Sequence, residues 1–247
     1  MVREKQRQGN LMAVSKYFSN TYISEAVDLS QGELQGASYV DKFGYNSALG
    51  NTYETIWSGN NIYTYIASAG TATVTSGDTN DNGGTVLVQG LDAAYNEVSE
   101  TLTIGGSAGS VQFYRVHRAS LETANTGDVN QGAITVTVDS KSAAIIPAGY
   151  GQTLMCLYTV PRRKKGYLFQ LDVGCSKDLE LEVKILVRNG STNVWNTKSF
   201  ITTRGGFLEK NFYIPIEIPA TNDIEVRAKA SATSAVSAGF ELVLVDK

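Results

Sequence analysis

The chain has 247 residues, of which 42% are hydrophobic and 18% are charged, and this composition excludes a disordered protein. The length suits one large all-β unit or two small domains, each with its own core. The formal net charge of −3 and the pI near 5.3 lack the basic excess of nucleic-acid-binding proteins, so we expect no specific nucleic-acid partner.

The N-terminal residues from Met1 to Gly9 are polar, and no apolar stretch of the kind found in a secretory signal follows them. No run approaches the roughly 18 apolar residues of a membrane-spanning helix. We therefore expect a protein that is made in a cytoplasm and has no membrane partner.

Residues 1–59 show neither a clean helical nor a clean strand periodicity. Large aromatic side chains are costly to leave in water, yet this turn-rich segment is poorly equipped to bury its own. The sequence therefore predicts an extended N-terminal arm that packs on the chain's own β-modules or on a neighbouring subunit. The aromatic residues expected to make these partner contacts are Tyr39, Phe43, Tyr45, Tyr53 and Trp57.

Residues 60–142 are predicted to form a small β-module of about five strands. A Gly- and Asn-rich turn at 77–84 separates two strand patterns and is typical of a hairpin loop. The Thr-rich alternation of the strands indicates one buried and one solvated face. The expected strands are 72–75, 85–89, 98–104, 112–119 and 133–139.

Residues 143–247 are predicted to form a jelly-roll-like antiparallel β-sandwich. The clearest strand runs from Leu179 to Val187, where apolar residues alternate with Glu180, Glu182 and Lys184. The stretch 224–230 alternates in the same way, so its charged residues are expected on a solvated face. A seven-stranded immunoglobulin-like sandwich is the alternative. The eight expected strands are 143–147, 152–160, 166–174, 179–188, 193–201, 207–214, 222–230 and 237–245.

The two cysteines, Cys156 and Cys175, are too few for a disulfide scaffold. If 152–160 and 166–174 form a hairpin, the two residues lie about 13 Å apart along the strands. A disulfide needs Cα atoms within about 7 Å, so we expect free, buried thiols.

No set of residues predicts catalysis or a metal site. The stretch Asp78–Gly83 matches the opening of an EF-hand loop, but Gln89 stands where the bidentate Glu is required and a strand follows. His117 is the only histidine, and it is expected to be a surface or interface strand residue. Glu180 and Glu182 lie about 7 Å apart, but on a solvated face rather than in a cleft. We therefore expect no enzyme activity and no cofactor.

One dense basic run, Arg162, Arg163, Lys164 and Lys165, falls at a predicted hairpin tip. Such a run can contact an acidic partner surface, or it can be a solvated turn that discourages edge-to-edge association. We include these four residues among the candidate partner-binding residues.

Several motifs resemble those of virion structural proteins of tailed bacteriophages, especially phages of aquatic bacteria and cyanobacteria. The resemblance covers roughly residues 37–175 and fades towards the C-terminus. It implies a particle component located in the virion and does not fix the position within it. The matching stretches are 40–46, 54–57, 90–101, 114–119, 145–154 and 158–161.

An aromatic arm, a small β-module and a jelly-roll-like module suit a protein that decorates or cements a capsid. We therefore expect a non-enzymatic cement protein, a homotrimer that binds the major capsid protein or other virion proteins and stabilises the head lattice. One alternative is a neck, tail or fibre-anchoring protein. Another is a carbohydrate-binding module displayed on the virion, for which Trp57, Trp195 and the many tyrosines are the candidate contacts.

Overall fold

The computed structural model describes residues 27–247. Apart from a helical turn at 27–30 and a short 3-10 helix, η1 (Thr79–Asp81), the regular structure in these residues is β-strand. This confirms the predicted all-β class with an antiparallel, jelly-roll-like sandwich. The strands are β1 (Ala37–Leu49), β2 (Glu54–Thr55), β3 (Gly70–Thr71), β4 (Thr73–Ser76), β5 (Thr85–Leu91), β6 (Glu97–Thr103), β7 (Gln112–Phe113), β8 (Arg115–Thr123), β9 (Ile134–Val138), β10 (Lys141–Ile146), β11 (Leu157–Thr159), β12 (Lys164–Arg188), β13 (Trp195–Ile218), β14 (Asp223–Ala230) and β15 (Ser234–Asp246).

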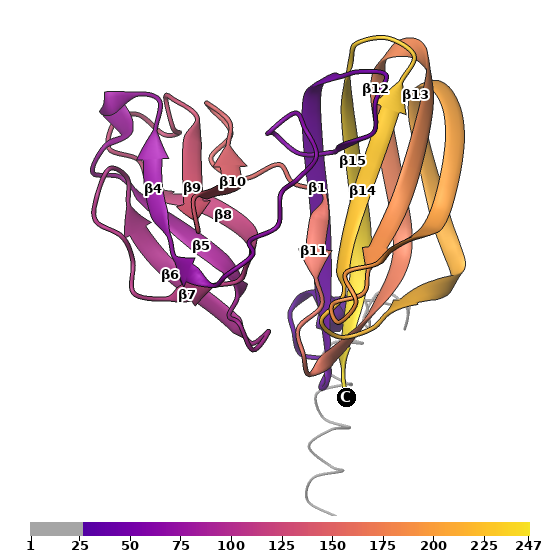
Figure 1. The fold of residues 1–247 in the computed structure, drawn as a ribbon, viewed down its shortest axis with the longest axis horizontal. Helices are drawn as coiled ribbons and strands as arrows, with labels where there is room; N and C mark the ends of the chain where they lie inside the picture. The colour runs from indigo at the N-terminus through magenta and orange to yellow at the C-terminus, as the bar shows by residue number, and fades with distance from the viewer. Residues whose placement is uncertain (1–26) are drawn as a thin grey trace, which may run out of the picture.

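The sandwich is built around one long hairpin, β12 and β13, which contributes to both layers (Figure 1). The first half of β12 pairs with β15, which in turn pairs with β1. The second half of β12 pairs with β14, which also pairs with β11 and β2. One strand can serve both layers because its pairing with β13 is interrupted between Cys175 and Glu180.

The bend is matched on β13 by Gly205 and Gly206, which have φ values of +58° and +65°. This left-handed backbone conformation favours glycine, so two consecutive glycines allow β13 to turn with β12. Four of the strands predicted from the sequence are therefore segments of two continuous strands, 164–188 and 195–218, and not separate elements.

A second body of smaller sheets lies beside the sandwich on the left of Figure 1. One three-stranded sheet has the order β10-β9-β4 and another has the order β6-β5-β8, while β3 pairs with β7. Its core is made of residues between Trp57 and Met155 together with Leu157 of β11. We call residues 57–155 the inserted module, because the chain leaves the sandwich after Ile56 and rejoins it at Cys156, both of which belong to the sandwich core.

This arrangement differs from the division at residues 59 and 142 that the sequence suggests. Residues 37–49 are not an arm outside the modules: they form β1, which pairs with β15 along nearly its whole length. The expected sandwich strand 143–147 belongs to β10, which pairs with β9 in the inserted module. The first 26 residues of the predicted arm lie outside the described residues.

Two predicted hairpins are also absent from the strand pairing of the described residues. β4 pairs with β9 and not with β5, and β11 pairs with β14 and not with β12. Both cysteines are nevertheless free and buried, as expected. A period-two pattern identifies a strand, but it carries no information on which strand lies beside it.

Candidate functional site at the junction of the two modules

The inserted module meets the sandwich mainly through β8. The register of β5 and β8 shifts so that Gln89 pairs with Arg118 and Gly90 pairs with Val116, which leaves His117 as an extra residue in a β-bulge. Val116 packs in the core of the inserted module. The bulge interrupts simple alternation, and His117 and Arg118 both contact residues of the sandwich.

Gly90 makes this close crossing of β5 and β8 possible. A Cβ atom at Gly90 would lie 1.9 Å from the carbonyl oxygen of Arg115. Since no side chain fits at that distance, only glycine allows β5 to approach the bulge.

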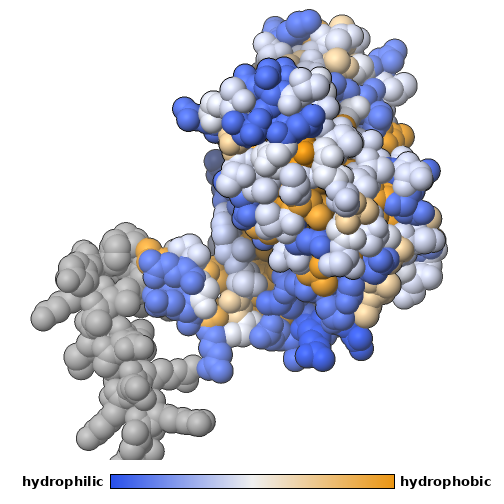
Figure 2. All heavy atoms as spheres, turned by 90° about the vertical axis from the view of Figure 1, so that its left-hand side faces the viewer, coloured by the Kyte–Doolittle hydropathy of each residue, from blue (hydrophilic) through white to orange (hydrophobic). Residues whose placement is uncertain are grey.

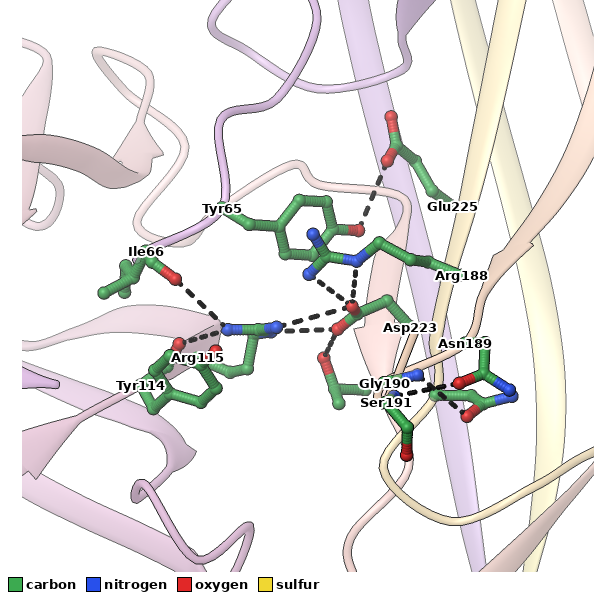
Figure 3. A network of polar contacts seen from close by, with 12 residues as sticks. Tyr65, Ile66, Tyr114, Arg115, Arg188, Asn189, Gly190, Ser191, Asp223 and Glu225 are labelled. Atoms are coloured by element: carbon green, nitrogen blue, oxygen red, sulfur yellow. Dashed lines mark hydrogen bonds and ion pairs between the residues drawn. The ribbon is translucent and has the colours of Figure 1, made fainter. Parts of the chain in front are cut away.

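Arg115 connects the two bodies through a buried ion pair with Asp223 at the start of β14 (Figure 3). Its Nε lies 2.9 Å from Oδ1 of Asp223, and the two side chains are 4% and 0% exposed. Arg115 also donates to the backbone oxygens of Ile66 and Tyr114. Burial alone would lower the pKa of Arg115, but the charge of Asp223 outweighs it and raises the pKa above its ordinary value.

Asp223 is shared with a second arginine. Nε of Arg188 donates to its Oδ2 at 2.7 Å, and the Thr159 hydroxyl donates to its Oδ1 at 2.5 Å. The carboxylate thus accepts bonds from β8, β11 and β12. A fully buried carboxylate needs this number of partners because desolvation otherwise favours its neutral form.

A second buried acid, Glu225, lies two residues after Asp223 on β14, so both side chains start from the same face of the strand. It accepts hydrogen bonds from Thr55 and Tyr65, and it pairs with Arg227 at 2.7 Å. Its side chain is 0% exposed, so the expectation that the charged residues of 224–230 share a solvated face is wrong for Glu225. The inserted module covers this part of the sheet through Tyr65.

Aromatic rings enclose the guanidinium groups of the junction. The Arg115 guanidinium lies 4.2 Å from the Tyr114 ring centroid and 5.1 Å from that of Tyr65. Arg188 lies 4.1 Å from the Tyr65 ring. Trp195 is 5.5 Å from Arg188 and 4.9 Å from Arg227, so its ring is engaged in cation–π contacts. It is therefore not a free platform for stacking a sugar.

Lys42 and His117 form a second buried contact between the modules. The Lys42 ammonium group donates to the backbone oxygen of His117, and the imidazole ring lies 4.3 Å from the ring of Tyr158 on β11. Burial lowers the pKa of Lys42 to about 7, and burial together with the charge of Lys42 holds the pKa of His117 well below its usual range. His117 is 8% exposed and its Nε2 has no hydrogen-bond partner among residues 27–247, so it is an interface residue rather than a surface one.

The predicted aromatic partner-binding residues lie in different places. Trp57 is 3% exposed, in the core of the inserted module, while Tyr39 is 40% exposed on β1. Tyr53 donates to Glu182 within the sandwich. Phe43 and Tyr45 are half-buried on β1, and Phe43 lies under the guanidinium of Arg118 at 6.0 Å. The structure does not bring the five aromatic residues together.

The basic run lies in the turn before β12 and in the first residues of that strand. Lys164 pairs with Asp246 at 3.4 Å and Lys165 pairs with Glu217 at 3.1 Å. Arg162 and Arg163 are exposed, and the backbone N–H of Arg162 donates to Tyr95 of the inserted module. Two of the four charges are therefore already matched within the chain, and Arg162 and Arg163 are the ones that face solvent.

Sequence reasoning missed the main residues of the junction, which are Lys42, Tyr65, Arg115, Arg188, Asp223 and Glu225. Several of these junction residues lie in sequence stretches singled out above. Lys42 belongs to 40–46, Arg115 and His117 belong to 114–119, and Tyr158 belongs to 158–161.

The stretch that resembles an EF-hand loop uses its acids within the chain. Asp78 caps η1, and the Asp81 carboxylate accepts hydrogen bonds from Ser76, Gln131 and Gly132. Burial tends to raise the pKa of Asp81, and these bonds outweigh it and lower the pKa. Within residues 27–247, no group of three or more His, Cys, Asp or Glu side chains is placed to hold a metal ion.

No family model matches the chain, and no curated protein matches it. Solved structures with partial likeness include the Yersinia pseudotuberculosis-derived mitogen, at 14% identity and a TM-score of 0.19 over 34% of this chain and 80% of that one. A CBM4 structure has 11% identity and a TM-score of 0.21 over 71% of this chain and 86% of that one. The infectious bursal disease virus Gt strain structure has 13% identity and a TM-score of 0.21 over 86% and 73% of the two chains. In residues 27–247 no helix has the length and hydrophobicity that crossing a bilayer requires.

Proposed function

We propose that this chain is a non-enzymatic structural component of a tailed-phage particle and that it decorates the capsid. The observation that carries the proposal is the exposed apolar edge formed by β13. Among the described strands β13 pairs only with β12, so its other edge is free. A long free strand edge with large apolar side chains is a ready site for association with another chain.

The most exposed part of β13 is a local protrusion. Where β12 pairs with β13, Gln170 lies opposite Asn211 and Leu168 lies opposite Ile216. The single β12 residue between them, Phe169, therefore stands opposite four residues of β13, 212–215. Tyr213 is 101% exposed and Ile214 is 81% exposed. We call residues 212–215 the β13 protrusion, and we assign it as the contact with a neighbouring particle subunit.

The other surfaces of the molecule differ from this edge. The face of the inserted module in Figure 2 shows apolar residues in small separate spots among hydrophilic ones. The free edges of β1 and β11 lie on the side of the inserted module, where Lys42 and Tyr158 contact His117. Attachment through β13 would leave the inserted module displayed on the outside of the particle.

The resemblance of several sequence motifs to virion structural proteins of tailed phages supports a particle component, without fixing its position in the particle. A neck or tail position would use the same surfaces. The two positions differ in copy number, which follows the capsid lattice for a decoration protein and a single ring for a neck or tail protein.

The test is addition of the purified chain to particles assembled without it. We expect stoichiometric binding over the capsid surface by electron microscopy, together with greater resistance to heat. The double variant Tyr213→Ser/Ile214→Ser should lose binding, whereas Ile62→Ser, at a residue 50% exposed on the inserted module, should bind like the unaltered chain. Binding at one vertex or on the tail would replace decoration with the neck or tail assignment, and no binding would refute the proposal.

A further inference from the structure

An apolar groove of about 580 Å³ lies over β1, β15 and the first half of β12. Two of its aromatic side chains are open to solvent, since Phe169 is 41% exposed and Tyr39 is 40% exposed. Apolar surface of this kind is costly to leave in water, so the groove marks a contact with another segment or chain. Its apolar walls are Leu29, Tyr39, Phe169, Leu242 and Val243.

The groove is held open by contacts within the sandwich. Tyr39 lies opposite Val243 in the pairing of β1 with β15, so both side chains leave the same face of the sheet. The Tyr39 hydroxyl donates to the Glu241 carboxylate, which also lines the groove. The aromatic wall is therefore fixed before any partner binds.

Four carboxylates lie on the same face of the sheet beside the groove. Asp41 lies opposite Glu241 in the pairing of β1 with β15. Asp172 lies opposite Glu209 on one side and opposite Gly239 on the other. Since Gly239 and Glu241 are two residues apart on β15, all four acids start from one face, and we call them the acidic patch. Burial and the charges of the other three carboxylates raise the pKa of Asp172. Within residues 27–247 none of the four is in an ion pair, so the patch favours a basic partner.

The N-terminal segment, residues 1–26, has the composition that this surface requires. It carries four basic and two acidic side chains, a net charge of +2 in a chain whose net charge is −3. The basic residues are Arg3, Lys5, Arg7 and Lys16. The stretch 11–23 is rich in large apolar residues, which include Leu11, Met12, Val14, Phe18 and Ile23.

The groove lies where this segment joins the described chain. Leu29 and Ser30 line the groove, and Ile23 precedes Leu29 by six residues. Six residues span at most about 20 Å, which lets the stretch 11–23 reach the groove of its own chain. A tether this short gives an effective concentration on the order of millimolar, which favours the chain's own groove over that of another copy.

We propose that the N-terminal segment docks on its own sandwich, with apolar side chains of 11–23 in the groove and basic side chains beside the acidic patch. The contact is separate from attachment through β13, because residues 212–215 do not line the groove. It would hold whatever particle position the chain occupies.

The test is photo-cross-linking of the full chain carrying Phe169→p-benzoylphenylalanine in the groove. Peptide mass spectrometry should find cross-links to residues 11–23. Phe200→p-benzoylphenylalanine, at a residue 51% exposed on β13 and outside the groove, is the matched control and should give no cross-link to this segment. In a mixture of isotope-labelled and unlabelled chains, the cross-linked peptides should come from one chain.

Two further changes, each made in the chain with the cross-linker at position 169, test the two kinds of contact. Phe18→Ser should weaken docking about tenfold, because it removes a large apolar side chain, whereas Gln8→Ser should leave the yield unchanged. Asp41→Asn with Glu209→Gln should also lower the yield, whereas Glu122→Gln with Asp128→Asn, at exposed residues of the inserted module, should not.

Three results would overturn the proposal. Position 169 could give no cross-link to residues 11–23, or either variant could give the same yield as its control. Cross-links of mixed mass would assign the groove to a second copy instead.

Discussion

Arg115 and Asp223 are 108 residues apart in the sequence and form a buried ion pair that joins the inserted module to the sandwich. The pair is connected to Arg188 and Thr159 on the sandwich side and to the oxygens of Ile66 and Tyr114 on the module side. Both charged groups of the pair thus have further hydrogen bonds within their own module. The pair therefore holds the two bodies in one defined orientation.

Arg115→Met should destabilise the chain by about 3–5 kcal/mol, because it removes one partner of a buried ion pair and leaves the Asp223 carboxylate underneutralised. Denaturant unfolding measures this loss. Arg204→Gln breaks the exposed pair with Asp178, whose side chains are 70% and 79% exposed, and should change stability by about 1 kcal/mol or less. Equal effects of the two variants would contradict a structural role of the buried pair.

His117 should make the fold sensitive to mild acid. Its pKa is held well below 6.5 in the folded chain by burial and by Lys42, whereas an unfolded histidine titrates near 6.5. The unfolded state therefore binds more protons as the pH falls below about 6.5, so stability drops by up to about 1.4 kcal/mol per pH unit. Unfolding curves between pH 7 and about pH 5 should show this slope, and His117→Phe should reduce it. An unchanged slope in the variant would mean that other groups cause the acid sensitivity.

Lys42 should also make the free energy of unfolding increase with pH, but in a higher pH range than His117. Its pKa is about 7 in the folded chain and near 10.5 when unfolded, so the unfolded state holds more protons between these values. The stability contributed by Lys42 therefore increases as the pH rises from 7 towards about 10. The groups that act on it are Arg118, Cys156, Asp41 and His117.

The measurement is the difference in unfolding free energy between the unaltered chain and Lys42→Met at pH 7 and about pH 9. Comparison with the variant cancels the other titrating groups. A difference that does not grow in favour of the unaltered chain with rising pH would refute the lowered pKa.

Gly90→Ala should disrupt the bulge at His117, because the new methyl group would lie 1.9 Å from the carbonyl oxygen of Arg115 and backbone atoms must move to admit it. We expect a loss of about 1–3 kcal/mol or more, together with shifted amide signals for β5 and β8. Gly50→Ala is the control, since its Cβ would meet nothing within 4 Å. A Gly90 variant as stable as the Gly50 variant would show that the crossing can relax.

The regular strands of the sandwich could be predicted from the sequence because their burial follows hydrophobicity. Leu181, Val183, Ile185 and Val187 alternate in the sequence, and all four are buried. β1 could not be found in this way. Three of the residues that it buries are Lys42, Gly44 and Asn46, so no apolar alternation marks the strand.

The junction was beyond prediction for a related reason. Asp223 and Glu225 alternate with apolar residues, which is also the pattern of a solvated strand face. They are buried because the inserted module covers that face through contacts between residues far apart in the sequence, such as those of Arg115 with Asp223 and Tyr65 with Glu225. The exposure of the large side chains of Tyr213 and Ile214 likewise depends on the irregular register between β13 and β12. The hydrophobic pattern of the sequence does not predict that register.

The insertion of residues 57–155 through a narrow stem determines how the molecule carries force. Trp57 and Met155 form a β-bridge where the chain enters and leaves the inserted module, so its two connections lie side by side. Tension along the sandwich is therefore carried by the hydrogen bonds of β1, β15, β12 and β14, and the inserted module lies outside that line. Stretching the sandwich would leave the module folded, while a sideways pull on the module would load the stem and the Arg115–Asp223 contact first.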